Sequence, residues 1–236
     1  MKNLILTALV LILFLAIPAS ADVVAPPEPS PTEIVAACSF MDVDQPDLET
    51  ISYDGAQSDT DGVAVKQGFD AYTSEALRNA FDIWTPLAAK GNAAAQYHLG
   101  LLFYGDGTTE ESLTCAVNWL QSAAAQGHLG ATSRLGLLKS AGDHSMIYTT
   151  EASRLLQYAA ERCHLDAQFQ FGSFLARTPK PHRDFVEAHK WLMVAAARGH
   201  VEAKTTIKIL RRFTSVAELR EGNRRHKEWL KNNPCE

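Results

Sequence analysis

The chain of 236 residues lacks the short motifs by which many enzymes and metalloproteins are recognised. It contains no His-Glu-x-x-His and no pair of Cys-x-x-Cys sequences, two common zinc-binding patterns. It also contains no Ser-x-x-Lys and no Gly-x-Ser-x-Gly, which carry the nucleophilic serine in two large classes of enzyme. We therefore expect no catalytic residue, no metal site and no cofactor.

Lysine and arginine are missing from residues 22–62, where ten acidic residues and five prolines occur instead. Charge of one sign combined with low hydrophobicity predicts disorder. We interpret this segment as a solvated tether, with a docking tail for a basic surface as the alternative. The whole chain has a formal net charge of -5, which argues against a nucleic-acid partner.

Residues 1–21 have the features of a signal peptide. Lys2 supplies the positive start, residues 4–17 the apolar run, and Ala19-Ser20-Ala21 the small-residue cleavage motif. The apolar run is short for a membrane span. We predict cleavage after Ala21 and a periplasmic or secreted mature chain without a transmembrane segment. An uncleaved membrane anchor is the alternative.

What the chain does contain is a repeat of 36 residues between positions 80 and 210. Alanine recurs at three positions of every unit: 80, 116, 152 and 188; 88, 124, 160 and 196; and 95, 131, 167 and 203. Glycine recurs at Gly100, Gly136 and Gly172, and Lys208 takes the fourth place. A fixed period of this length indicates a solenoid of stacked helical hairpins. Lys208 fits a helix that no further repeat covers.

The helical spacing of apolar residues gives the expected boundaries. The repeats lie near 80–115, 116–151, 152–187 and 188–213, within a solenoid that spans 63–232. We expect an N-terminal capping helix after residue 63 and a C-terminal capping helix over 215–231, because the ends of a solenoid need a polar outer face. The predicted fold is therefore all-α.

Two segments resemble Sel1-like repeats, which are relatives of tetratricopeptide repeats. They are Ala-Ala-Lys-Gly-Asn-x-x-Ala-Gln-Tyr-x-Leu-Gly at 88–100 and Trp-Leu-x-x-Ala-Ala-x-x-Gly-His-x-x-Ala at 191–203. The resemblance covers roughly 80–211 and implies a right-handed α-superhelix that binds proteins. It implies no catalytic residue. The chain departs from the pattern at Cys163, which takes the place of the turn glycine.

The four cysteines, Cys38, Cys115, Cys163 and Cys235, all follow the predicted cleavage site. An even number in an oxidising compartment favours disulfides, and four cysteines allow three connectivities. Cys115 and Cys163 fall at opposite edges of the stack, roughly 16 Å apart, so their pairing is disfavoured. A bond from Cys163 to Cys235 is conceivable and would leave Cys38 with Cys115. Buried free thiols are the alternative.

Three histidines, His128, His164 and His200, occupy the same position in successive repeats. That spacing separates neighbouring rings by about 15 to 20 Å, too far for one metal ion with ligands at about 2 Å. We interpret them as residues that start the second helix of each hairpin.

The predicted C-terminal helix carries a basic face formed by Arg220, Arg224, Lys227 and Lys231. From residue 204 onward the chain has nine basic and four acidic residues, a formal charge of +5. A solvated capping face is the simplest interpretation. The alternative is a surface that binds an anionic partner or the acidic segment of the same chain. These four residues are our candidate binding residues.

The sequence as a whole predicts a non-enzymatic scaffold or adaptor that binds proteins in the bacterial cell envelope, with a regulatory or complex-organising role. Because some proteins of the resembled family have been credited with penicillin binding or hydrolysis, a cell-wall or β-lactam binding protein with weak hydrolase activity is one alternative. A structural spacer is another.

Overall fold

The computed structural model describes residues 29–38, 60–74, 76–106, 109–141, 146–179 and 183–235. The predicted signal peptide and most of the acidic segment lie outside these residues. The described residues form eleven α-helices and no strand, which confirms the all-α prediction. The helices are α1 (Pro31–Ala37), α2 (Thr60–Thr73), α3 (Leu77–Ala89), α4 (Ala93–Asp106), α5 (Glu110–Ala125), α6 (Leu129–Ala141), α7 (Met146–Glu161), α8 (Leu165–Arg177), α9 (Phe185–Ala197), α10 (Val201–Leu210) and α11 (Val216–Asn232).

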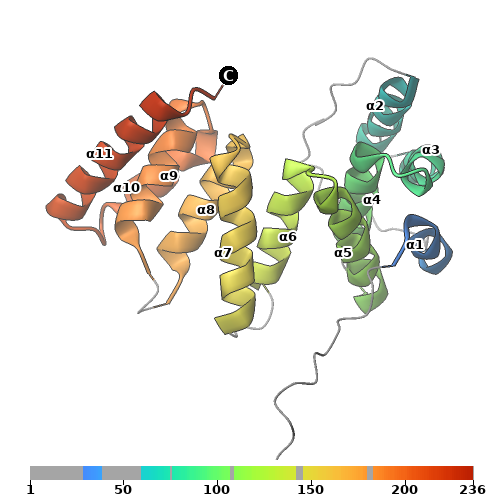
Figure 1. Cartoon of the computed structure of the whole chain (residues 1–236), viewed down its shortest axis with the longest axis horizontal. Coiled ribbons are helices and arrows are strands. Elements are labelled where there is room, and N and C mark those ends of the chain that lie inside the picture. Colours follow the sequence, from blue (N-terminus) through green and yellow to red (C-terminus); the bar gives the residue numbers. More distant parts are fainter. Residues whose placement is uncertain are drawn as a thin grey trace, which may run out of the picture.

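Four helical hairpins stack in sequence order into an elongated solenoid (Figure 1). The hairpins are α3–α4, α5–α6, α7–α8 and α9–α10, and each packs on the next along the row. Their first helices each bury a large side chain, such as Trp84, Trp119 and Trp191 at 1% exposure. This confirms the α-solenoid of about four repeats.

The turn inside each hairpin is built in the same way. Gly91, Gly127 and Gly199 have φ angles of +92°, +86° and +97°, and Cys163 takes the equivalent place at +67°. A residue with a positive φ angle adopts the left-handed backbone conformation, which ends a helix by turning the chain away from the helix axis. The next residue then caps the second helix in three of the four hairpins, through the side chains of Asn92, His128 and His164. This confirms His128 and His164 as helix-starting residues, whereas His200 makes no such capping bond.

The glycine column sets the distance between hairpins. A methyl group placed on Gly100 would lie 2.7 Å from Leu120 of the next hairpin, and the same contact recurs between Gly136 and Leu156 at 2.8 Å. Only a residue without a side chain allows the helices to approach so closely. At the fourth position of the column stands Lys208, and α11 packs on α9 instead of continuing the stack. The expectation for Lys208 is thus confirmed.

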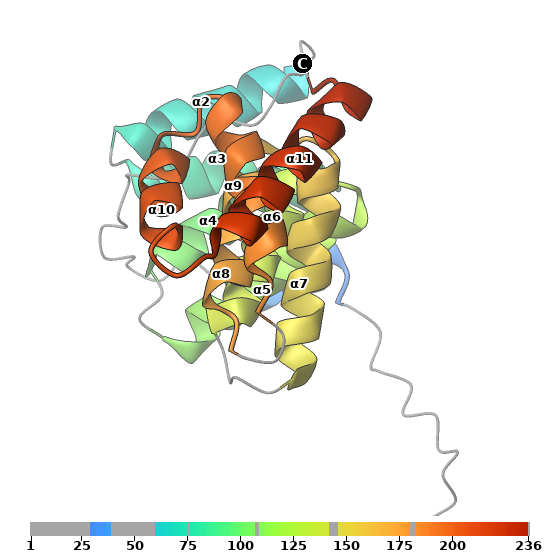
Figure 2. The same ribbon diagram turned by 90° about the vertical axis from the view of Figure 1, so that its left-hand side faces the viewer.

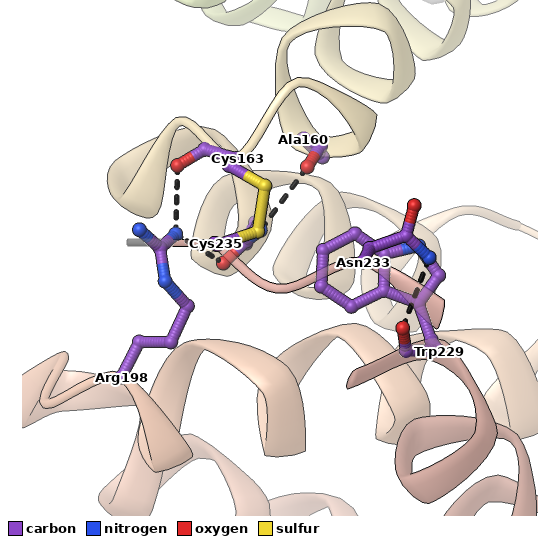
Figure 3. Close-up of a disulfide and its surroundings, with 7 residues drawn as sticks. Ala160, Cys163, Arg198, Trp229, Asn233 and Cys235 are labelled. Carbon is purple, nitrogen blue, oxygen red and sulfur yellow. Dashed lines mark hydrogen bonds between the residues drawn. A yellow bond between two sulfur atoms is a disulfide. The ribbon is translucent and has the colours of Figure 1, made fainter. Parts of the chain in front are cut away.

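The C-terminal helix α11 crosses the end of the molecule obliquely (Figure 2). Gly222 allows α11 to pass within contact of His189 on α9, and Trp229 packs edge-on against Trp191 with ring centroids 5.1 Å apart. A disulfide joins Cys235, just beyond α11, to Cys163 at the turn of the third hairpin (Figure 3). The predicted capping helix at 215–231 is therefore present, with Ser215 as its N-cap residue.

A second disulfide joins Cys38 to Cys115 at the other end of the solenoid, with Cα atoms 5.7 Å apart. Both pairings are those that the repeat geometry left open, and the alternative of free buried thiols is wrong. The bond from Cys38 holds the short helix α1 against α5 and α3.

The prediction of disorder is wrong for the residues of α1. Ser30 and Glu33 form a reciprocal capping box, Pro31 occupies the first turn, and Ile34 is only 1% exposed. A helix of seven residues is unstable alone, because nucleation outweighs the few hydrogen bonds gained. The buried Ile34 and the disulfide supply the tertiary contacts that stabilise it. The prediction is also wrong for residues 60–62, which begin α2, whereas residues 22–28 and 39–59 lie outside the described residues.

The glycine column generates a direct test with a matched control. A methyl group on Gly172 would meet the Leu192 side chain at 2.8 Å and two backbone atoms at 3.0 and 3.1 Å, and backbone atoms cannot easily yield. We expect Gly172→Ala to lower the free energy of unfolding by about 1–3 kcal/mol, measured by urea denaturation. Lys208→Ala, at the equivalent but exposed position, should change it by less than about 0.5 kcal/mol. Equal effects would contradict the proposed role of the column.

Buried histidines make the stability depend on pH. Burial lowers the pKa of His189 and of His226, both at the contact between α9 and α11, and lowers that of His98 to about 3. An unfolded chain protonates histidine near pH 6.5, so below that pH the unfolded state binds more protons than the folded state. Stability should therefore be greatest above pH 6.5 and decrease as the pH falls, by at most about 1.4 kcal/mol per pH unit for each proton.

Urea titrations between pH 7.5 and 4.5 measure this dependence. His189→Gln removes one titrating group while keeping a donor for Asn223, which lies 3.2 Å from the His189 ring nitrogen. We expect a shallower fall in the variant than in the unaltered protein. Identical slopes in the two proteins would show that His189 does not contribute.

Candidate protein-binding groove

A groove of about 990 Å³ lies on the face formed by the second helices of the last three hairpins, α6, α8 and α10. Successive hairpins supply it from equivalent positions. Leu137, Ser173 and Ile209 are separated by one repeat each, and so are Asp166 and Glu202. The groove is thus a direct product of the repeat, widened by the connection between α8 and α9 and by the residues that follow α10.

The apolar part of the groove includes large side chains that remain accessible. They are Leu137, Phe169, Phe185, Ile209 and Phe213. Ile209 is 54% exposed and Phe213 is 68% exposed. Leu101, three repeats before Ile209, is only 2% exposed because the next hairpin packs over it. At α10, where the repeat ends, the equivalent position is exposed, and in α6 the equivalent Leu137 is half-buried in the groove.

Acidic side chains lie at one end of the groove, in the first turns of α8 and α10. The His200 ring stacks on Phe169 with centroids 4.2 Å apart and stands between two carboxylates. Its Nε2 atom is 3.7 Å from Asp166, and its Nδ1 atom is 3.1 Å from Glu202 without the alignment of a hydrogen bond. This end can attract a basic group of a ligand.

Basic side chains lie at the opposite end. Arg177 is the last residue of α8, and Arg183 lies in the connection to α9, where its Nε atom donates to the Thr178 carbonyl at 2.9 Å. Arg134 of α6 also lines the groove, and its guanidinium lies over the Tyr104 ring at 5.5 Å. Within the described part of the chain, none of these three arginines forms an ion pair with a carboxylate. Their guanidinium groups are therefore available to an anionic ligand.

The predicted basic face of α11 is separate from this groove. Arg220, Lys227 and Lys231 are exposed, whereas Arg224 already pairs with Glu221 at 2.7 Å and with Glu228 at 2.8 Å. The hydrogen bonds from Arg224 and Arg225 lower the pKa of Glu221 to about 2. Part of the predicted positive charge is thus neutralised within α11 itself. The use of this face for binding stays a prediction.

The described part of the acidic segment does not contact α11. Helix α1 packs against α3 and α5, at the far end of the stack from α11 (Figure 1). Glu33 on α1 is engaged with Ser30 in the capping box. An intramolecular contact between α11 and residues 22–28 or 39–59 lies outside the described residues.

A smaller cavity of about 570 Å³ lies between α5, α6 and α7. It borders Leu155, which stands where the neighbouring repeats have Trp119 and Trp191. Lys139 and Glu151 at its edge pair with each other at 3.0 Å. The cavity is smaller than the groove on α6, α8 and α10, which is therefore the stronger candidate for a binding site.

Sequence reasoning did not identify the groove residues. It singled out His200 but none of Phe169, Arg177, Ile209 and Phe213. A usable signal was present, because position 209 carries an apolar residue in the last repeat, where no further repeat can cover it. Comparing each unit with its predicted neighbour, rather than searching for motifs, would have found it.

Comparisons with known proteins give a likeness to solved structures. No family model matches the chain, and no curated protein matches it. A solved structure similar to it is that of a protective antigen present in uropathogenic Escherichia coli strains, described as displaying an SLR fold. The two chains share 18% identity with a TM-score of 0.49, over 72% of this chain and 45% of that protein. The chain thus spans less than half the length of the antigen.

Neither a helix suited to span a membrane nor a cluster suited to hold a metal ion occurs among the described residues. None of their helices combines the length and the apolar character that a membrane span requires. Nor do three or more His, Cys, Asp or Glu side chains of these residues gather closely enough to hold a metal ion.

The exposure of the groove residues predicts how substitutions affect stability. The double variant Ile209→Ser and Phe213→Ser should change the free energy of unfolding by less than about 1 kcal/mol, because both side chains are already mostly accessible to water. Leu210→Ser, between them, removes a side chain that is 4% exposed and should cost about 2–5 kcal/mol. Thermal and urea denaturation measure both. A large loss in the double variant would show that these residues belong to the core.

Proposed function

We propose that this protein is a non-enzymatic scaffold of the Sel1-like repeat type that binds a partner protein in the groove between α6, α8 and α10. The observation that carries the proposal is the accessible apolar surface around Ile209 and Phe213, bordered by arginines that have no carboxylate partner among the described residues. Contiguous apolar surface with a polar rim marks interaction sites on proteins. Aromatic residues and arginine are also the types enriched in protein interfaces.

The proposed location is the bacterial cell envelope, in the periplasm or outside the cell. Two disulfides and no free cysteine in the described part of the chain support an oxidising compartment. The predicted signal peptide supports export. In this location a rigid stack of hairpins serves a regulatory or complex-organising role, because it holds a partner in a fixed orientation.

Site-specific cross-linking in living cells tests the proposal. A photoreactive phenylalanine at Phe213 should form a saturable cross-link to one partner protein. The same group at Val63, which is 55% exposed on α2, is the matched control and should not form it. Adding Ile209→Ser should abolish the product from position 213. The absence of a specific product at 213, or the same products at both positions, would overturn the proposal.

A parallel variant examines the basic face of α11. Reversing the charge of Arg220, Lys227 and Lys231 leaves the groove intact, since these residues do not line it. If the groove is the binding site, the cross-link from position 213 persists in this variant. Its loss would move the site to α11.

A further inference from the structure

The C-terminal end of the stack carries exposed positive charges on both of its helices. Figure 2 looks onto this end, where α10 and α11 lie nearest the viewer. On the α10 side the charges recur at every fourth residue, and on α11 they recur at intervals of seven and four residues, so each set lies along one side of its helix. We call these six exposed residues the terminal basic face: Lys204, Lys208, Arg212, Arg220, Lys227 and Lys231.

The charges of the terminal basic face are not neutralised by neighbouring side chains. Among the described residues none of the six pairs with a carboxylate, and Arg224 engages two glutamates of α11 instead. At the opposite end of the stack the exposed charges do pair, Lys66 with Asp70 at 2.8 Å and Arg78 with Asp82 at 3.5 Å. A capping surface needs to be polar, but it does not need charge of one sign. The excess of positive charge therefore points to an anionic partner.

The charge of the whole chain has the same polarity. Residues from 204 onward have a formal charge of +5, which leaves -10 for residues 1–203 because the whole chain sums to -5. An extended anionic surface attracts the C-terminal end and repels the remainder. Such a surface would therefore orient the stack with α10 and α11 toward it.

The composition of the terminal basic face differs from that of the groove. Four of its six residues are lysines, and lysine is depleted in protein interfaces, where aromatic residues and arginine are enriched. None of the six lines the groove or the smaller cavity. A lysine ammonium is a strongly hydrated charge on a flexible stem. These properties suit attraction to a charged surface across water better than close packing against a protein.

The charges are also spread over a wide area. They extend about 12 Å along the α10 side and about 16 Å along α11, at 1.5 Å per helical residue. Val216, the first residue of α11, is 65% exposed and lies on the same side of the helix as Arg220 and Lys227. A broad set of cations with an apolar side chain among them fits a layer of lipid headgroups better than a single anion.

We infer that the terminal basic face docks this protein on a membrane surface that contains anionic phospholipids. Each lysine or arginine near such a surface adds to the attraction, which falls off within the screening length of the solution. The contact needs no cavity and no membrane-spanning helix. It goes beyond the proposed function, because the groove on α6, α8 and α10 takes no part in it.

Co-sedimentation with lipid vesicles tests the inference. Residues 22–236 are used, so that the apolar residues 4–17 cannot themselves insert into the vesicles. Phosphatidylcholine vesicles with about a quarter phosphatidylglycerol are compared with vesicles of phosphatidylcholine alone, at about 0.1 M salt. We expect the protein to bind the anionic vesicles at least about tenfold more tightly, and to lose this preference at about 1 M salt, where the screening length is about 3 Å.

Two variants of equal charge show whether the terminal basic face is responsible. Lys208→Gln with Lys227→Gln removes one charge from each helix and should weaken binding to the anionic vesicles by at least about tenfold. Lys90→Gln with Arg154→Gln removes two exposed charges elsewhere and is the matched control. We expect it to weaken binding by less than about twofold, because distant charges are screened. Circular dichroism verifies that both variants are folded.

A local probe shows which end meets the lipid. An environment-sensitive fluorescent amino acid at position 216 should shift its emission to the blue when anionic vesicles are added. The same amino acid at Val63, which is 55% exposed on α2, should keep its spectrum.

Equal binding to the two kinds of vesicle, equal losses in the two variants, or an unchanged spectrum at position 216 would each overturn the inference. A soluble polyglutamate peptide is the competing probe. If the peptide binds the terminal basic face and the anionic vesicles do not, the face serves an acidic protein segment and membrane docking is wrong. The cross-link from Phe213 tests the groove separately, so either proposal can fail while the other stands.

Discussion

The structure depends on the contact between a glycine in the second helix of one hairpin and a leucine in the first helix of the next. Gly100, Gly136 and Gly172 make this contact at nearly the same distance, 2.7 to 2.8 Å from an added methyl group. A repeated contact of one geometry keeps each hairpin in the same relation to its neighbour. The groove depends on this even spacing, because equivalent residues of α6, α8 and α10 line up along it only when the hairpins are evenly spaced.

The same contact explains why the stack ends where it does. Lys208 replaces the glycine, and the position that would hold the facing leucine, 20 residues later, is occupied by Glu228. A lysine side chain prevents the close approach of another helix, so α11 takes a different course and packs on α9 through Gly222. The side of α10 that another hairpin would cover remains open. The termination of the repeat therefore leaves Ile209 and Phe213 exposed at one side of a groove that α6 and α8 also line.

Much of the fold could be predicted because it follows from local and periodic signals. The 36-residue period located the hairpins, and the edges on which their turns fall limited the possible cysteine pairs. The helix α1 was missed because its local signals, Ser30 and Glu33 in a capping box, were outweighed by the composition of the whole acidic segment. The pairing of Arg224 with Glu221 and Glu228 was also missed, although spacings of three and four residues in a helix predict it. The groove could not be predicted from motifs, because it depends on which surfaces the neighbouring hairpins leave uncovered.

The two disulfides hold the places where a solenoid is weakest. Each hairpin contacts mainly its neighbours, so the terminal units have support on one side only and are the first to separate by thermal motion. The bond from Cys38 fastens α1 over the first two hairpins, and the bond from Cys235 returns the last helix to the third hairpin. Opening therefore has to begin inside the stack, where every hairpin has two neighbours. A protein built in this way resists digestion by proteases that attack frayed ends, which is an advantage wherever such enzymes are abundant.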